Sequence, residues 1–303
     1  MLRILLLGGF RAYDDDRPIA RLGTPKVQAF FSFLLLHRSR LWPREVLAST
    51  FWPDADRQSA RNSLNTTVSR LRGALAPFQE GHSYLVMRPG FLGVDPDHQP
   101  WLDTSAFEAA VAEADGCAVD DPDREAALVR ADALYGGELL EGFYEDWCVC
   151  ERERLHRLHV LMLESLMASR ERRGEPAAAI ALARRILSAE PLREDVHRNV
   201  MRLYLRLGLR TEVCRHYVEL RRALLRELGV APMQDTQDLW REISRPLAAP
   251  DQDSRRTFEA ILRGLDELRD HIAAVIGRGG TDAAGADAKQ WSEANDRPTV
   301  RFL

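Results

Sequence analysis

Length, composition and charge describe an ordinary globular chain and exclude several classes of protein. The chain has 303 residues, which favours more than one domain, and its 45% hydrophobic and 29% charged residues are typical of globular proteins. Its four cysteines lack the spacing of a disulfide framework, and no stretch approaches the roughly 18 apolar residues that a membrane span requires. We therefore expect a cytoplasmic protein that has no membrane partner.

The net charge of −4 is distributed unevenly along the chain. Residues 1–95 hold 13 basic and 8 acidic residues, a net charge of +5, whereas the remaining residues hold 29 basic and 38 acidic ones. Nearly all of the basic residues in the first part are arginines, whose guanidinium groups suit bidentate contacts to phosphate and to guanine. This segregation favours a nucleic-acid surface in the N-terminal part.

The first 23 residues predict short strands. Met1 to Tyr13 is apolar and rich in β-forming residues, with an interruption at Gly8-Gly9. Asp14 to Asp16 predicts a turn, after which Ile19 to Leu22 is expected to pair back on the preceding strand. A small N-terminal sheet is therefore expected.

Three helices are predicted to follow these strands. Thr24 suits an N-cap and Pro25 suits the first helical position, for a helix from Lys26 to about His37. A second, short helix is expected to begin at Pro43, and a third to span roughly Arg57 to Ala76. Apolar residues recur along the third helix at helical spacing and predict its buried face: Ala60, Leu64, Val68, Leu71 and Leu75.

A β-hairpin is predicted after the third helix. Its strands are Tyr84 to Arg88 and Phe91 to Val94, and Pro89-Gly90 between them is the signature of a type II turn. Strands, three helices and a hairpin, in that order, are typical of a winged helix with an additional N-terminal sheet. We assign residues 1–98 to this α+β domain.

The chain after about residue 102 predicts only helices. Gly174 and Gly208 lie 34 residues apart at the ends of predicted helices, and a 34-residue helical period is typical of tetratricopeptide repeats. We assign residues 99–245 to this all-α domain, so the expected fold class is mainly α. The predicted helices span residues 104–115, 122–136, 143–173, 176–189, 193–207, 210–228 and 235–245.

The C-terminal residues predict a linker, a helix and a tail. Residues 246–254 contain two prolines and predict a linker. Residues 255–277 carry apolar residues at heptad spacing from Phe258 to Val275, which suits a dimeric coiled coil and equally a helix folded back on its own helical domain. Residues 278–303 predict a flexible tail.

The polar face of the third helix is the main candidate for a functional site. Spacings of 4, 4 and 3 place Arg61, Asn65, Ser69 and Arg72 in one stripe opposite the apolar face. Such side chains contact base edges in the major groove, so Asn65 is expected to pair with adenine, and an arginine with guanine or phosphate. Arg88, beside the hairpin turn, either touches phosphate or the minor groove or has no partner. The alternative for the helix is a solvated amphipathic surface.

No residues in the sequence form a recognisable catalytic or metal-binding set. Gly8-Gly9 lacks the Lys-Ser/Thr of a phosphate-binding loop. Cys148 and Cys150, near His156 and His159, come nearest to a metal site, but residues two apart do not share a helix face. We therefore expect neither an enzyme nor a metal or cofactor.

Two separated blocks of residues resemble a known family. The first is similar to the OmpR-type winged helix that opens SARP-like regulators, and it comprises Leu6–Phe10, Pro25–Ala29, Arg44–Leu47, Phe51–Asp54 and Ala60–Arg72. The second resembles the bacterial transcriptional activator domain (BTAD), which is tetratricopeptide-like, and it comprises Trp147–Arg152, Glu190–Glu194, His197, Arg198, Met201, Gly208, Tyr217 and Leu228–Pro232.

The resemblance implies a bacterial transcriptional activator. Such proteins bind direct repeats in double-stranded DNA as side-by-side protomers and help to recruit RNA polymerase, so a homodimer is expected at least on DNA. Carried over to this sequence, the DNA contacts are Arg61, Asn62, Asn65, Thr66, Ser69, Arg70, Arg72 and Arg88. Two alternatives remain open: an interaction scaffold whose winged helix docks a protein, and a sensor that holds a small molecule in its helical repeat.

Overall fold

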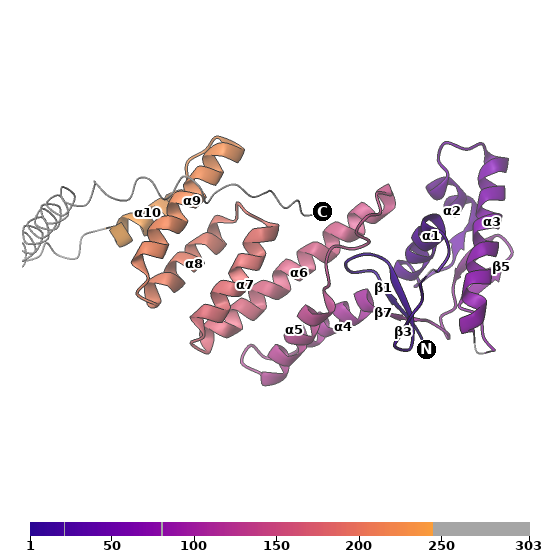
Figure 1. Cartoon of the computed structure of the whole chain (residues 1–303), viewed down its shortest axis with the longest axis horizontal. Coiled ribbons are helices and arrows are strands. Elements are labelled where there is room, and N and C mark those ends of the chain that lie inside the picture. Colours follow the sequence, from indigo (N-terminus) through magenta and orange to yellow (C-terminus); the bar gives the residue numbers. More distant parts are fainter. Residues whose placement is uncertain (21, 80, 245–303) are drawn as a thin grey trace, which may run out of the picture. The chain divides into compact units, whose positions relative to one another are not determined.

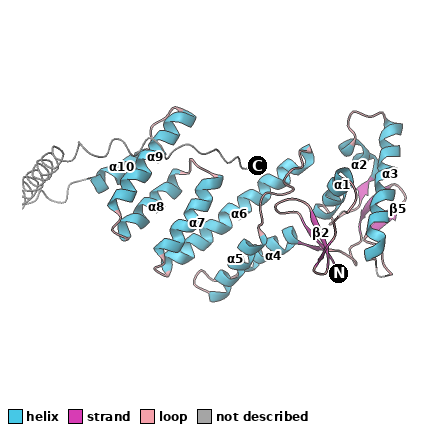
Figure 2. Cartoon of the chain, viewed as in Figure 1, coloured by secondary structure: helices cyan, strands magenta, loops and turns pink. Residues whose placement is uncertain are grey.

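The structure, a computed structural model, describes residues 1–244 except Arg21 and Glu80 (Figure 1). Residues Met1–Gln237 form one compact unit, and a second begins at Asp238, of which only the end of the last helix is described. The predicted linker, C-terminal helix and tail at 246–254, 255–277 and 278–303 lie outside the described residues. Among those described, all named strands lie in the first 102 residues and the rest is helical (Figure 2), as predicted for the fold class.

A four-stranded sheet with the order β3-β2-β1-β7 contains the start of the chain. Strand β1 (Leu2–Leu5) pairs antiparallel with β2 (Arg11–Asp14), which pairs antiparallel with β3 (Arg17–Pro18). On its other edge β1 pairs in parallel with β7 (Trp101–Leu102). The sequence did not predict β7, because two residues carry no alternation of polar and apolar side chains.

The returning strand, predicted at Ile19 to Leu22, lies instead at Arg17–Pro18, and Ile19 donates its N–H to the carbonyl of Ala12 on β2 at 2.9 Å. Asp14 pairs with Arg17 across a two-residue turn, so the returning strand begins at once rather than two residues later. The turn is this tight because Asp15 adopts a left-handed conformation, with a φ of 51°. Aspartate tolerates this conformation better than most residues.

Three helices follow as predicted, with small shifts at their ends. They are α1 (Pro25–Leu36), α2 (Arg44–Phe51) and α3 (Arg57–Leu75). The Thr24 hydroxyl accepts the N–H of Val27, which confirms the predicted N-cap. The predicted start of α2 was one residue early, because Pro43 belongs to a short strand, β4 (Trp42–Pro43). The buried residues of α3 are the five predicted ones and Thr67: Ala60, Leu64, Thr67, Val68, Leu71 and Leu75.

The predicted hairpin is present in a second sheet, with the order β4-β6-β5. It consists of β5 (Leu85–Arg88) and β6 (Phe91–Val94), in which Arg88 pairs with Phe91 across the turn. Gly90 has a φ of 78°, the conformation that the third residue of a type II turn requires. Helices α1 to α3 and this hairpin make a winged-helix-like arrangement.

The remaining described chain is helical and close to the predicted boundaries. Successive helices from α4 to α9 pack against one another, and Gly174 and Gly208 follow α6 and α8 as predicted. A short 3-10 helix, η1 (Ala76–Phe78), follows α3. The helices are α4 (Asp103–Gly116), α5 (Pro122–Leu134), α6 (Asp146–Arg172), α7 (Pro176–Ala189), α8 (Glu194–Arg206), α9 (Arg210–Leu228) and α10 (Gln234–Ser244).

A buried carboxylate joins the N-terminal sheet to the first helix of the helical region. Asp103, which is 1% exposed, accepts the backbone N–H groups of Leu6 and Leu7 at 2.9 Å and that of Thr104 at 2.7 Å. Burial raises the pKa of Asp103, although these three N–H groups act in the opposite direction. Nearby, the N–H of Gly8 donates to the carbonyl of Glu138 at 2.9 Å. We call this set of contacts the Asp103 junction.

Candidate nucleic-acid interface

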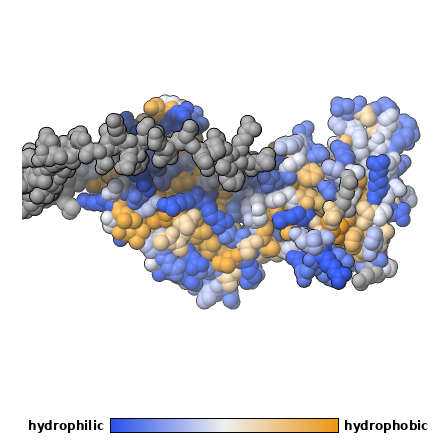
Figure 3. Space-filling model, viewed as in Figure 1, coloured by the Kyte–Doolittle hydropathy of each residue, from blue (hydrophilic) through white to orange (hydrophobic). Residues whose placement is uncertain are grey.

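All eight residues predicted to contact DNA are exposed. Seven lie on α3 and Arg88 lies at the end of β5. Helix α3 begins at this surface because the side chain of Asp56 accepts the N–H groups of Gln58 and Ser59, at 2.9 and 3.0 Å. On the face shown in Figure 3, hydrophilic side chains predominate at the upper part of the edge where α3 runs, and hydrophobic ones form patches both beside the lower part of α3 and over the helical region.

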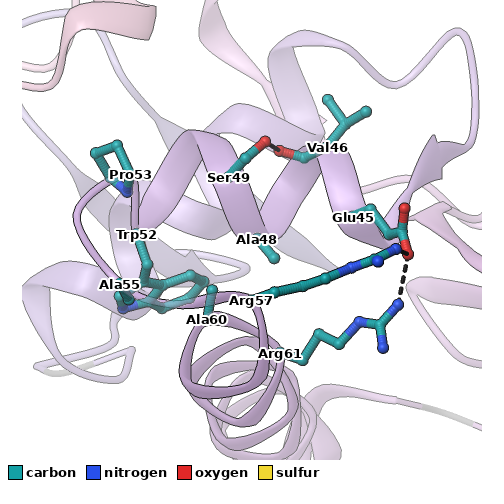
Figure 4. Close-up of a pocket in the computed structure, with 10 residues that line it drawn as sticks. All are labelled: Glu45, Val46, Ala48, Ser49, Trp52, Pro53, Ala55, Arg57, Ala60 and Arg61. Carbon is teal, nitrogen blue, oxygen red and sulfur yellow. Dashed lines mark hydrogen bonds and ion pairs between the residues drawn. The ribbon is translucent and has the colours of Figure 1, made fainter.

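Two arginines at the start of α3 share one carboxylate from α2. Glu45 Oε1 accepts Arg57 Nη2 at 2.6 Å and Arg61 Nη2 at 2.5 Å (Figure 4). These hydrogen bonds hold the pKa of the Glu45 carboxyl below its ordinary value. All three side chains are well exposed, at 59% for Glu45, 74% for Arg57 and 46% for Arg61. Exposed ion pairs of this kind contribute little to stability, because water screens them, so a phosphate can replace the carboxylate at small cost.

The same residues border a cavity between α2 and the start of α3. Its volume is about 430 Å³, and Trp52, Pro53 and Ala60 supply part of its apolar wall (Figure 4). Glu45, Arg57 and Arg61 supply its charged side. The cavity therefore lies next to the predicted DNA-contacting surface rather than in the helical region.

A third arginine links α2, the hairpin turn and α3. Arg44, the first residue of α2, donates its backbone N–H to the carbonyl of Gly90 at 2.9 Å. Its Nη2 donates to Asn65 Oδ1 on α3 at 2.6 Å. Asn65 and Arg61 also line one cavity of about 450 Å³ with Arg44 and Gly90. The structure thus brings two predicted contact residues next to the turn that carries Arg88.

The other predicted residues differ in how far their polar groups are engaged. Asn62 accepts the side-chain amide of Gln58 at 3.2 Å through Oδ1, and the hydroxyl of Thr66 at 3.0 Å through its backbone carbonyl. Of the eight predicted residues, three arginines make no side-chain hydrogen bond or ion pair within the described part of the chain, which leaves their charges available to a ligand: Arg70, Arg72 and Arg88. Their open charges favour a polyanionic partner.

The sequence reasoning missed Arg44, Glu45 and Arg57 as members of this surface. Arg57 was predicted only as the start of the third helix, and Arg44 and Glu45 only as part of a family motif. For Arg44 and Glu45 that motif was the available signal, because helical spacing relates residues on one helix and is silent about a neighbouring helix. For Arg57, four residues before Arg61 on α3, helical spacing was itself the available signal. The packing of α2 on α3 brings Arg44 and Glu45 to Asn65 and Arg61, whereas Arg57 lies one helical turn before Arg61 on α3 itself.

The cysteines considered as metal ligands lie on different sides of α6. Cys148 is buried and donates to the carbonyl of Glu145 at 3.0 Å, whereas Cys150 is exposed. Among the described residues, no three His, Cys, Asp or Glu side chains are grouped so as to hold a metal ion. No helix in the described part of the chain has the length and apolar character needed to cross a membrane.

Comparisons with known proteins agree with the fold. Residues 102–244 match the bacterial transcriptional activator domain. Regulatory protein AfsR of Streptomyces coelicolor is 30% identical over 245 residues, which cover 80% of this chain and 24% of AfsR. Regulatory protein DnrI of Streptomyces peucetius is 27% identical over 258 residues, which cover 80% of this chain and 92% of DnrI.

A solved structure has the same fold. Mycobacterium tuberculosis EmbR, in complex with a low affinity phosphopeptide, aligns with a TM-score of 0.65 and 23% identity, over 88% of this chain and 71% of that chain. Residues 102–244 thus match the bacterial transcriptional activator domain, and the chain shares its fold with the EmbR structure. The resemblance to SARP-like regulators, inferred from the sequence, is confirmed by these relatives, although the chain spans only about a quarter of the length of AfsR.

Proposed function

We propose that this protein regulates transcription by binding duplex DNA in a sequence-specific manner through α3 and the β5–β6 hairpin. The exposed face of α3 is the observation that carries the proposal. Its polar residues face solvent. Arg70 and Arg72 on α3 and Arg88 on the hairpin have no side-chain partner in the described part of the chain. Arg61 and Arg44 do have partners, Glu45 and Asn65, but both partners are exposed. On a surface of this kind, contacts with DNA can replace the contacts between side chains at a small cost in free energy.

In this proposal α3 lies in the major groove. Its arginine, asparagine and hydroxyl side chains then contact base edges, and arginines near the ends of the interface contact phosphates. Arg88 at the hairpin contacts phosphate or the adjacent minor groove. Phosphate contacts supply most of the affinity, whereas base contacts supply the specificity.

The second part of the proposal concerns transcriptional activation, which we assign to the helical region. We propose that the protein is a cytoplasmic activator rather than an enzyme, that protomers bind side by side on direct repeats, and that they help to recruit RNA polymerase. The support is the match of residues 102–244 to the activator domain and the regulatory relatives whose similarity covers 80% of this chain.

In-vitro selection tests the DNA-binding part of the proposal. The full chain is incubated with a library of random duplexes at low salt, and the bound duplexes are sequenced over several rounds. We expect a repeated motif to be enriched, and Arg72→Ala to reduce that enrichment. A library that stays random would overturn the proposal and favour the scaffold, whereas enrichment that appears only after a metabolite is added would favour the sensor.

A further inference from the structure

Arg44 occupies a position that the sequence did not assign to the DNA-contacting surface. Its backbone is fixed by the carbonyl of Gly90 at 2.9 Å, at the turn of the β5–β6 hairpin. Its side chain crosses to α3, where Nη2 lies 2.6 Å from Asn65 Oδ1. The guanidinium of Arg44 is therefore held at the side of one predicted base-contacting residue, and it is part of the same surface.

The contact with Arg44 fixes the orientation of the Asn65 amide. A guanidinium group has hydrogen-bond donors and no acceptor, so the amide oxygen of Asn65, and not its nitrogen, must face Arg44. The Nδ2 group then faces away from Arg44, and Asn65 is exposed at this point of the surface. An amide that is free to rotate by 180° presents either group to a base, whereas this one is oriented before DNA arrives.

The pair of side chains has many more donors than acceptors. Arg44 and Asn65 together present the remaining guanidinium N–H groups and the two N–H groups of Nδ2, while the one side-chain acceptor, Oδ1, already accepts one of the two hydrogen bonds that it can take. In the major groove guanine offers two acceptors, N7 and O6, whereas adenine offers one acceptor beside a donor, its N6 amino group. That amino group would meet the donors of Arg44.

We propose that Arg44 and Asn65 form one recognition unit whose base is guanine rather than adenine. Arg44 is a specificity-determining residue in this unit, since it both orients Asn65 and adds donors beside it. Arg61, which lines the same cavity, pairs with Glu45, and it is Arg44 whose guanidinium donates to Asn65. The inference rests on the proposed function and replaces the adenine contact that the sequence suggested for Asn65.

The test measures base preference at single positions of a duplex taken from the selection described above. Asn65→Ala identifies the position, because its discrimination there is lost while other positions are unchanged. We expect the full chain to prefer guanine over adenine at that position by about tenfold. Arg44→Met should remove this preference, Arg44→Lys should keep part of it, and adding Asn65→Ala to Arg44→Met should have no further effect on it.

Controls separate a role in specificity from a role in affinity alone. Arg206→Met removes an exposed arginine from α8 and should leave the base preference unchanged. A uniform loss of affinity for all sequences in Arg44→Met, with the preference for guanine intact, would assign Arg44 to a phosphate and overturn the proposal. Preference for adenine in the unaltered chain would overturn it as well. Absence of any duplex binding would overturn the proposed function itself, so the two failures are distinguishable.

Discussion

The exposed face of α3 and the Asp103 junction are both built from hydrogen bonds to charged groups, yet they differ in burial. The arginines at the start of α3 share Glu45, whose side chain is 59% exposed. Asp103 is 1% exposed, and its partners are backbone N–H groups rather than side chains. Water can replace the partners of Glu45, whereas it has no access to those of Asp103.

Because of this difference in burial, the contacts of Asp103 stabilise the fold, whereas those on the face of α3 are available to a ligand. A buried polar group that loses its partner costs about 1–3 kcal/mol, because no water compensates it. An exposed ion pair costs about 0–1 kcal/mol to break. We therefore expect substitutions at the Asp103 junction to change stability, and substitutions on the face of α3 to change DNA affinity.

Asp103→Ala should have the largest effect on stability. It leaves the buried N–H groups of Leu6, Leu7 and Thr104 without an acceptor, and we expect the free energy of unfolding to fall by about 2–5 kcal/mol. Urea denaturation followed by circular dichroism measures this. Asn65→Ala on α3 is the matched control and should stay within about 0.5 kcal/mol of the unaltered chain. Equal effects of the two substitutions on the free energy of unfolding would contradict the distinction between the buried Asp103 junction and the exposed face of α3.

Gly8→Ala should destabilise the same junction by about 2 kcal/mol. Gly8 has a φ of 81°, and a Cβ there would lie 2.9 Å from the backbone carbonyl oxygen of Gly136. The control is Gly73→Ala on α3, where a Cβ meets no other atom within 4 Å. It should stabilise the protein by about 0.5–1 kcal/mol, since alanine favours a helix. A thermal unfolding series of both variants gives the signs, and a neutral Gly8→Ala would contradict this account of the junction.

Arg72→Ala should change DNA affinity and leave stability unaltered. Arg72 is exposed and has no partner in the described part of the chain, so its loss costs the fold little. If it makes a bidentate base contact, duplex binding should weaken by about 1–3 kcal/mol. Fluorescence anisotropy with a selected duplex measures the affinity, and Arg206→Met is the control for the loss of one positive charge. A variant that binds as tightly as the unaltered chain would remove Arg72 from the interface.

Glu45→Gln should have the smallest effect, and of opposite sign. It removes the negative charge beside Arg57 and Arg61 and frees both guanidinium groups for phosphates. We expect duplex affinity to rise about threefold to tenfold. The same anisotropy titration at fixed salt measures the change. A loss of affinity would mean that Glu45 positions the two arginines for DNA instead of competing with it.

Patterns within single elements predicted most of the fold. The period of Ala60, Leu64 and Val68 defined the buried face of α3, and Pro89-Gly90 defined the hairpin turn. Strand β7 and the early return at Arg17 escaped prediction because they are two-residue pairings, which depend on a partner strand and carry no period of their own.

The candidate site was predicted only in part, for a similar reason. The stripe from Arg61 to Arg72 is exposed, as helical spacing required, but whether it contacts DNA stays a prediction. Spacing along α3 is silent about Arg44 and Glu45, which reach the site from α2. The Asp103 junction was missed because two of its three donors, the N–H groups of Leu6 and Leu7, lie almost a hundred residues earlier in the chain.

The salt dependence of duplex binding tests the central claim most directly. The full chain and an Arg70→Ala, Arg72→Ala, Arg88→Ala variant are titrated with a selected duplex over a range of salt concentrations. The account predicts that the logarithm of the affinity falls linearly with the logarithm of salt, by about 0.9 per phosphate contact, and that the variant binds more weakly with a shallower slope. Absence of binding at low salt, or the same affinity and slope in the variant, would contradict the account.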